Sequence, residues 1–282
     1  YVTAPLARVD VVGTEILSGA VRLTNVSSVS FRDTVFDESS GGPTITSSDL
    51  ALVAGNTAPW IRVENTPAVE VVENILTSAE RIYLSGRSIG AYVRGNTTAD
   101  GTGGAVVPSG WAPDGTRLDA DLPYIFDEGT VQVAAGSTVT VGAGTVLKLR
   151  GSLTQRPVAF SVAGRMVFDG TASDPVVIAD ARDDTAGGDT DGLDAPVQGY
   201  DGNYAVLGLS GAGRIEVDRA LMKGSGTLIM AVPGTTWAGG FGTGAGSGGR
   251  IEITRSTFRS GTAISSSADL HSVRFAGNAV EH

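Results

Sequence analysis

The segment Gly213-Arg-Ile-Glu-Val-Asp-Arg-Ala-Leu-Met-Lys-Gly returns 36 positions later as Gly249-Arg-Ile-Glu-Ile-Thr-Arg-Ser-Thr-Phe-Arg-Ser. A Gly-rich insertion, 233–248, lies between the two copies. Without about 14 residues of this insertion the repeat would be about 22 residues long, which is typical of one coil of a stacked repeat protein. The pair therefore predicts stacked strands rather than two unrelated segments.

Recurring asparagines give a second, independent period. Asn56, Asn74, Asn96 and Asn278 each follow a strand-like run rich in Val or Ala, and three of them stand in Gly-Asn pairs. Successive positions are 18 and 22 residues apart, and Asp33 precedes Asn56 by 23. Asparagine tolerates left-handed backbone and can hydrogen-bond along a stack of turns. The alternative is a set of unrelated turn residues.

The hydrophobic pattern has the period of strands. Apolar residues alternate in runs such as Val139–Val141 and Val158–Val162, with Gly or Asp between runs, and helical patterns are scarce. A β-sandwich would need more two-residue hairpin turns than the chain offers. We therefore predict an all-β, right-handed parallel β-helix (solenoid) with loop insertions. About eleven to twelve coils, spaced by about 4.8 Å, would make a rod of roughly 50–60 Å.

The organisation along the chain is predicted in three parts. Coils are expected over 1–97, a loop or unit junction rich in Gly, Asp and Pro over 98–123, and further coils over 124–282. The last part carries an acidic loop, 180–194, and the Gly-rich insertion 233–248.

Composition narrows the function classes. The 282 residues contain no Cys and carry a formal net charge of -10. Disulfide scaffolds and Cys-based zinc sites are excluded, and an acidic surface disfavours nucleic acid. No apolar run approaches the roughly 18 residues of a membrane helix, so no membrane span is expected in this segment. Because Tyr1 is no natural start, we expect a segment of a longer protein.

One stretch, from about Leu122 to Gly224, carries a family resemblance. It contains in order Gly136-Ser-Thr-Val-Thr-Val-Gly-Ala-Gly-Thr-Val-Leu-Lys, Val167-Phe-Asp-Gly-Thr-Ala-Ser-Asp-Pro-Val-Val-Ile and Asp183-Asp-Thr-Ala-Gly-Gly-Asp-Thr-Asp-Gly. This order resembles a repeat of very large exported bacterial proteins with the pectin-lyase-like right-handed β-helix. The resemblance implies that fold and a secreted or cell-surface location, with neighbouring β-helix segments in the same parent chain.

The acidic loop is the best candidate for a cation site. Six carboxylates fall within 15 positions, and such crowding is unfavourable unless water or a cation neutralises it. Ca²⁺ takes six to eight oxygen ligands, so calcium is the expected ion, in a structural role, while a solvated surface loop is the equal alternative. The candidate ligands are Asp180, Asp183, Asp184, Asp189, Asp191 and Asp194.

Two aromatic residues in the insertion, Trp237 and Phe241, are candidates for stacking on a sugar or a partner, or for covering a face of the coils. The only histidines are His271 and His282, and no partner that would orient either for catalysis can be specified. Polygalacturonase-type β-helices carry Gly-His-Gly and Arg-Ile-Lys, whereas this chain has the repeated Gly-Arg-Ile-Glu and no Gly-His-Gly.

The sequence therefore predicts a non-catalytic structural or adhesive module of a large secreted or cell-surface protein, stabilised by calcium. A polysaccharide or another surface protein is the expected partner. The alternatives are a lyase or hydrolase acting on an acidic polysaccharide, which rests on fold analogy alone, and a carbohydrate-binding rod.

Overall fold

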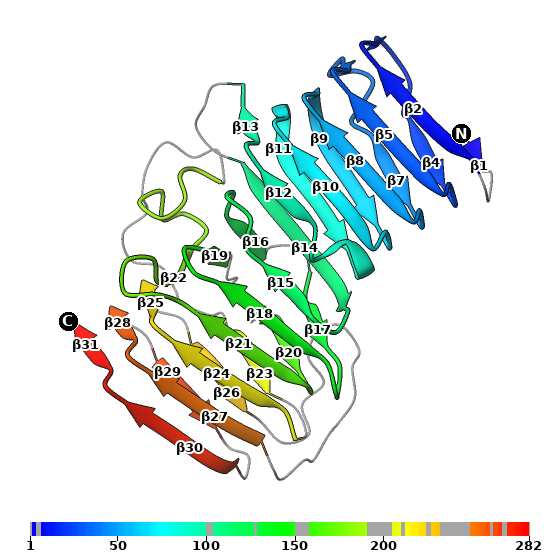
Figure 1. Ribbon diagram of the computed structural model, residues 1–282. Coiled ribbons are helices and arrows are strands. Elements are labelled where there is room, and N and C mark those ends of the chain that lie inside the picture. The colour runs from blue at the N-terminus through cyan, green and yellow to red at the C-terminus, as the bar shows by residue number, and fades with distance from the viewer. Residues whose placement is uncertain are drawn as a thin grey trace.

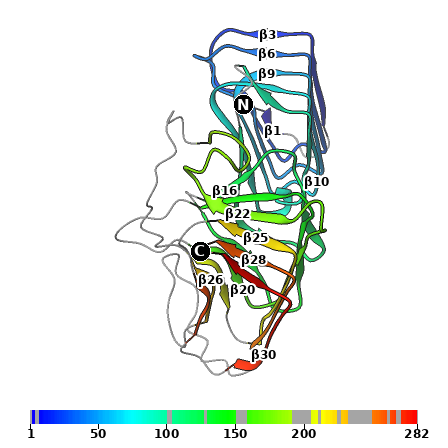
Figure 2. The ribbon, with the colours of Figure 1, turned by 90° about the vertical axis from the view of Figure 1, so that its left-hand side faces the viewer.

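The chain winds into an elongated stack of short strands, with its termini at opposite ends (Figure 1). The computed structural model describes residues 2–3, 7–99, 104–126, 129–149, 158–190, 205–209, 212–223, 227–231, 249–259, 262–266 and 270–281. Every strand pairing within these residues is parallel. Seen from the side, successive coils lie one above another (Figure 2). The arrangement is that of a parallel β-solenoid, as the repeats predict.

Two sheets form one face of the stack. The first has five strands: β2 (Arg8–Val12), β5 (Ser28–Arg32), β8 (Leu50–Ala54), β10 (Ala68–Val72) and β12 (Tyr92–Arg94). The second has six: β15 (Thr116–Leu118), β18 (Thr138–Gly142), β21 (Arg165–Asp169), β24 (Arg214–Asp218), β27 (Gly249–Thr254) and β30 (Leu270–Ala276). With one such strand in each coil, the described residues form eleven coils.

The remaining strands are linked into one sheet that forms the other faces. They are β1 (Val2–Thr3), β3 (Glu15–Ile16), β4 (Arg22–Thr24), β6 (Val35–Phe36), β7 (Thr44–Thr46), β9 (Thr57–Glu64), β11 (Ile75–Ser85), β13 (Thr97–Thr98), β14 (Ala105–Ala112), β16 (Tyr124–Phe126), β17 (Val131–Val133), β19 (Val146–Leu149), β20 (Val158–Val162), β22 (Val176–Asp180), β23 (Ala205–Leu209), β25 (Ala220–Lys223), β26 (Thr227–Ala231), β28 (Thr257–Arg259), β29 (Thr262–Ser266) and β31 (Ala279–Glu281). A single 3-10 turn, η1 (Gly86–Ser88), interrupts the described strands. No helix in the part of the chain described is long and apolar enough to cross a membrane.

The sequence repeat that predicts the fold is a strand pair in register. Arg214, Ile215 and Glu216 of β24 pair with Arg250, Ile251 and Glu252 of β27. The 36-residue offset is thus one coil plus the insertion between β26 and β27. The next coil returns after 22 residues, since the backbone N–H of Ser256 donates to Asn278 Oδ1.

The interior is a continuous apolar column. In strands such as β8 and β9, alternate residues point inward and are buried, so that Ala51 and Val53 of β8 are core residues. Aromatic rings contact one another inside it: the Phe160 ring lies 5.0 Å from that of Phe126, in a tilted arrangement, and 6.4 Å from that of Phe168, edge to face. The residues that point inward from one coil pack against those of the coils above and below it. No coil therefore has a core of its own.

A buried asparagine ladder lines the first coils. The Asn56 side-chain amide donates to Asn74 Oδ1 at 2.9 Å, and that of Asn74 donates to Asn96 Oδ1 at 2.8 Å. This confirms the stacking of the recurring asparagines. The ladder position before Asn56 belongs to Thr34, whose N–H donates to Asn56 Oδ1. The sequence spacing pointed to Asp33 instead, but that residue is exposed with φ of +50°, one position outside the column.

The face sheets change at the segment 98–123, where the sequence predicts a loop or junction. Strand β14 joins the two parts, because its first half pairs with β11 and its second half with β17. Two contacts tie the connecting segment to β12: Arg94 lies 3.4 Å from Asp119, and Gly95 N–H donates to Asp121. The predicted division of the chain into two sets of coils, with a loop or unit junction over 98–123, stays a prediction.

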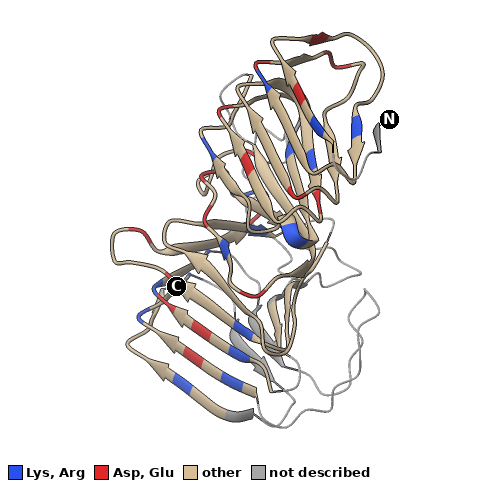
Figure 3. Cartoon of the chain, turned by 45° about the vertical axis from the view of Figure 1, so that its right-hand side comes forward, with Lys and Arg blue, Asp and Glu red and all other residues tan. Residues whose placement is uncertain are grey.

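Opposite charges alternate on the outer face of the six-stranded sheet (Figure 3). The Glu216 carboxylate forms ion pairs with Arg165, at 2.8 Å, and with Arg214, at 2.5 Å. The hydrogen bond from Arg165 is the main cause that holds the pKa of Glu216 below its usual range, against a smaller opposing effect of burial. In the same way the hydrogen bond from Arg255 lowers the pKa of Asp218. The pairs of Arg165 with Glu216 and of Arg255 with Asp218 connect neighbouring coils.

Candidate functional site

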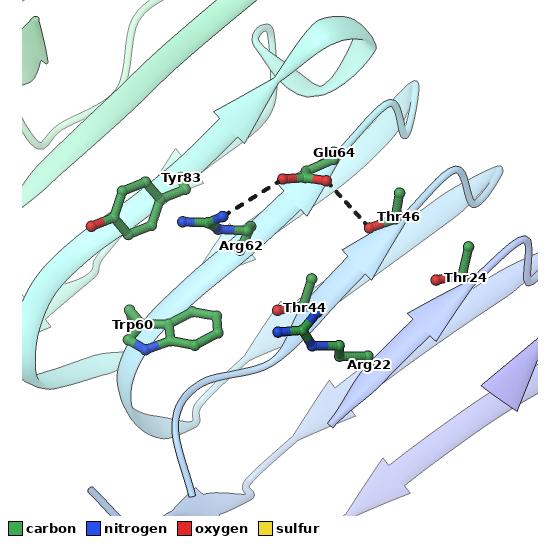
Figure 4. Close-up of a pocket in the computed structure, with 8 residues that line it drawn as sticks. All are labelled: Arg22, Thr24, Thr44, Thr46, Trp60, Arg62, Glu64 and Tyr83. Atoms are coloured by element: carbon green, nitrogen blue, oxygen red, sulfur yellow. Dashed lines mark hydrogen bonds and ion pairs between the residues drawn. The ribbon is translucent and has the colours of Figure 1, made fainter. Parts of the chain in front are cut away.

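The outer surface of four consecutive coils in the first part of the chain holds an open groove of 530 Å³ (Figure 4). Strands β4, β7, β9 and β11 contribute its floor. At the spacing of neighbouring strands, the floor spans about 14 Å along the stack. The residues that line it are Arg22, Thr24, Thr44, Thr46, Trp60, Arg62, Glu64 and Tyr83.

Strand alternation explains why these side chains share one surface. In β9 the run Trp60-Ile-Arg-Val-Glu64 buries Ile61 and Val63 in the core, so Trp60, Arg62 and Glu64 point outward. Parallel pairing then aligns the coils. Arg22 pairs with Thr44, Thr44 with Arg62, and Arg62 with Tyr83, which makes one row along the axis.

Arg62 is held by aromatic rings. Its guanidinium carbon lies 4.6 Å from the centroid of the Tyr83 ring and 5.9 Å from that of Trp60. Its ion pair with Glu64 is long, 3.9 Å between Nη1 and Oε1, and its Nε is buried with no hydrogen-bond partner within the described residues. A guanidinium carries five donors in a fixed plane. The rings therefore orient a cation whose donors are poorly used by the protein.

Gly42 packs directly against Trp60. A Cβ on Gly42 would lie 1.5 Å from the Trp60 carbonyl oxygen and 3.0 Å from the indole, so only glycine fits there. The backbone of the preceding turn thus approaches the half-buried indole directly. The position of the indole is fixed by the fold, which lowers the entropic cost of using it as a stacking surface.

Arg22 supplies a second cation at the other end of the row. Its side chain is exposed and makes no ion pair or hydrogen bond within the part of the chain that the structure describes. Between the two arginines lie threonine hydroxyls, of which Thr46 donates weakly to Glu64 at 3.5 Å. The lining therefore combines two cations, two aromatic rings, three hydroxyls and one carboxylate.

The predicted acidic loop lies farther along the same surface and is held by lysine. The carboxylate of Asp183 pairs with Lys223 at 3.0 Å and accepts a hydrogen bond from Thr185. Burial raises the pKa of Asp183, but the hydrogen bonds from Thr185 and Lys223 outweigh it, so the net shift is downward. Lys148 is completely buried and donates to the Gly188 carbonyl and to Thr190 Oγ1.

The six predicted calcium ligands are not gathered within the described residues. Asp180 is nearly buried at the end of β22, and one of its oxygens accepts from the Arg182 N–H at 3.0 Å. Asp191 and Asp194 lie outside the described residues. In the part that is described, no three His, Cys, Asp or Glu side chains form a group that could hold a metal ion. Calcium binding stays a prediction.

Of the other residues that the sequence singled out, His271 belongs to β30, on the six-stranded sheet and away from the groove. Trp237, Phe241 and His282 lie outside the described residues. The groove residues were missed because no motif marks them. Their signal was the alternation of Trp60, Arg62 and Glu64, combined with the coil period that sets Arg62 beside Thr44 and Tyr83.

Comparison with known proteins adds no relative: no family model, curated protein or solved structure matches this chain. The function must therefore be argued from the groove itself.

Proposed function

We propose that the chain is a non-catalytic structural and adhesive module of a large secreted or cell-surface protein, of the right-handed, pectin-lyase-like kind, and that it holds an anionic polysaccharide in the groove. Arg62 is the observation that carries the proposal. Its guanidinium lies over the Tyr83 ring and near the Trp60 ring, its side chain is 43% exposed, and its ion pair with Glu64 is long at 3.9 Å.

The chemistry of the lining fits an acidic sugar chain. A planar guanidinium recognises a carboxylate or sulfate with two parallel hydrogen bonds. The Trp60 and Tyr83 rings offer apolar faces, and the threonines offer hydroxyls for sugar hydroxyl groups. The groove has two arginines against one carboxylate, although the whole chain carries a charge of -10. The local field therefore favours an anion that the rest of the surface repels.

The same lining argues for binding without turnover. Glycoside hydrolysis uses two carboxyl groups on either side of the bond that is cleaved. Within the groove only Glu64 carries a carboxyl group, and it already contacts Arg62 and Thr46. The lining of the groove therefore offers the hydrolase alternative no second carboxyl group.

Affinity electrophoresis in gels containing a uronic-acid polysaccharide or a neutral glucan tests the proposal. We expect retardation by the acidic polymer alone, and a loss of affinity of about tenfold or more for Arg62→Met, from one charge-assisted contact. The matched control is Arg32→Met, which removes an exposed arginine from the five-stranded sheet. Equal migration of all three proteins in both gels, or release of cleaved sugar, would overturn the proposal.

A further inference from the structure

The row of outward residues that forms the groove does not stop at Tyr83. Tyr83 pairs with Val107 of β14, and Val106 beside it pairs with Tyr124 of β16. Lys148 of β19 pairs with Ile125 and with Ala179 of β22. The same surface of the solenoid therefore continues from the groove onto the later coils.

Past the apolar residues Val107 and Ile125 this continuation carries lysines, and the acidic loop covers it. The chain has two lysines, Lys148 and Lys223, and both stand on this surface. Residues 181–190 of the acidic loop fold back over it. Lys148 is left with no exposure, and Lys223 pairs with Asp183 and donates to Thr185 Oγ1 at 2.5 Å.

The loop meets the groove at its Tyr83 end. Ala181, the first residue of the loop, is completely buried in a small apolar cluster with Ala105, Val107 and Ile125, and Tyr83 packs against that cluster. The ring that orients Arg62 is thus the last groove element before the loop. Farther along the loop, Gly187 lies against Pro123 and Val146.

The loop contacts its lysines with the groups that an acidic sugar would offer. Thr185 and Thr190 present hydroxyl oxygens, Asp183 presents a carboxylate and Gly188 presents a carbonyl. Arg22 and Arg62 in the open groove have no such set of partners within the described residues. One half of the row is therefore occupied by the chain itself and the other half is open.

We infer that loop 181–190 sets the length of the ligand: it occupies the cationic continuation of the groove as an internal substitute for the anionic sugar chain, and so confines the ligand to the four coils from β4 to β11. This inference rests on the proposed function. The three aspartates of the loop, Asp183, Asp184 and Asp189, against one arginine also repel an anionic chain that would extend past Tyr83.

The test is a titration with uronic-acid oligosaccharides of increasing length. For the wild-type protein, we expect affinity to rise with length and then stay constant once the ligand fills the groove. For Asp183→Asn, which removes the ion pair that Lys223 makes with the loop, we expect the plateau to move to longer oligosaccharides, with an affinity gain for the longest on the order of tenfold from one added charge-assisted contact. Asp49→Asn, at an exposed position of the first coils, is the matched control for the change in net charge.

The double variant Asp183→Asn, Lys223→Met should lose the gain, because the cation is then absent. If Asp183→Asn does not fold, Thr185→Ala removes the hydroxyl that Lys223 and Asp183 share but keeps their ion pair, so the same shift of the plateau is expected at a smaller size. An unchanged plateau in a folded variant, with wild-type binding intact, would overturn the inference but leave the proposed function standing. Absence of wild-type binding to any length would overturn both.

Discussion

The guanidinium of Arg62 lies over the ring of Tyr83, with 4.6 Å between its central carbon and the ring centroid. The two residues are direct partners across β9 and β11, so the stacking of coils creates the contact. A cation over an aromatic face is favourable by about 0.5–2 kcal/mol. Arg62 is thus positioned by the ring and by a long ion pair with Glu64, and within the described residues its guanidinium makes no hydrogen bond that would compete with those to an anion.

Breaking the buried asparagine ladder should destabilise the first coils. Asn74→Ala removes the acceptor of the Asn56 side-chain amide and of the Asn56 backbone N–H, and it removes the side-chain donor to the Val53 carbonyl, whereas Asn96 Oδ1 keeps the backbone N–H of residue 74. Each buried polar group left unpaired costs about 1–3 kcal/mol, so we expect a loss of about 3 kcal/mol or more. Chemical denaturation measures it, with Asp49→Ala as an exposed control. Equal stability of the two variants would show that the ladder contributes little.

Gly42→Ala should disrupt the groove, because Gly42 packs directly against Trp60. The added Cβ would meet the carbonyl oxygen of Trp60, which belongs to the backbone and cannot rotate away. We expect a lower unfolding midpoint and a loss of binding to acidic polysaccharide. Gly90→Ala is the matched control, since its Cβ meets Thr116 at an ordinary 3.5 Å. If both alanines are tolerated alike, the support of Trp60 by the 41–42 turn is not required.

Stability should fall in acid because of paired carboxylates. Since Arg165 holds the pKa of Glu216 below its usual value, folding favours the charged form. This contribution is complete above the unfolded-state pKa of about 4.3 and is lost as the pH falls through the lower folded value. Glu216→Gln should cost about 1 kcal/mol at neutral pH and flatten the acid limb of a denaturation series. Glu70→Gln, on an exposed carboxylate, should do neither; an identical acid limb in both variants would contradict the pairing.

Neutralisation of the acidic loop by lysine and neutralisation by calcium lead to opposite predictions for the melting midpoint. Asp183 is already paired with Lys223, and no metal-binding group of three forms within the described residues. Pairing of Asp183 with Lys223 predicts a melting midpoint that is the same with calcium and with EDTA. A midpoint raised by calcium and lowered by EDTA would contradict this expectation and support the site predicted from Asp180 to Asp194.

The sequence predicted the stack because its signals are local and periodic. The two Gly-Arg-Ile-Glu segments are paired strands, and Asn56, Asn74 and Asn96 form one ladder. The sequence pointed to Asp33 and not to Thr34, because threonine is common throughout the chain and a threonine in the ladder does not stand out by residue type.

The site could not be predicted in the same way. Its residues come from four coils, and their closeness depends on a register that varies from coil to coil: Asn56 reaches across 18 residues and Asn74 across 22. The acidic loop was visible as a cluster of charges. The lysine partners of the loop could not be predicted, because they are distant in sequence. Lys148 is 40 residues from Gly188, and Lys223 is 38 residues from Thr185.

Fluorescence of Trp60 tests the central claim most directly, because the indole lines the groove beside Arg62. The other tryptophans, Trp111 and Trp237, are replaced by Phe, so that Trp60 alone reports. Titration with a uronic-acid oligosaccharide should then change the emission in a saturable way. The change should disappear in Arg62→Met, and a neutral oligosaccharide of the same length should give none. An emission unaffected by the acidic ligand, or changed equally by both ligands, would contradict the account.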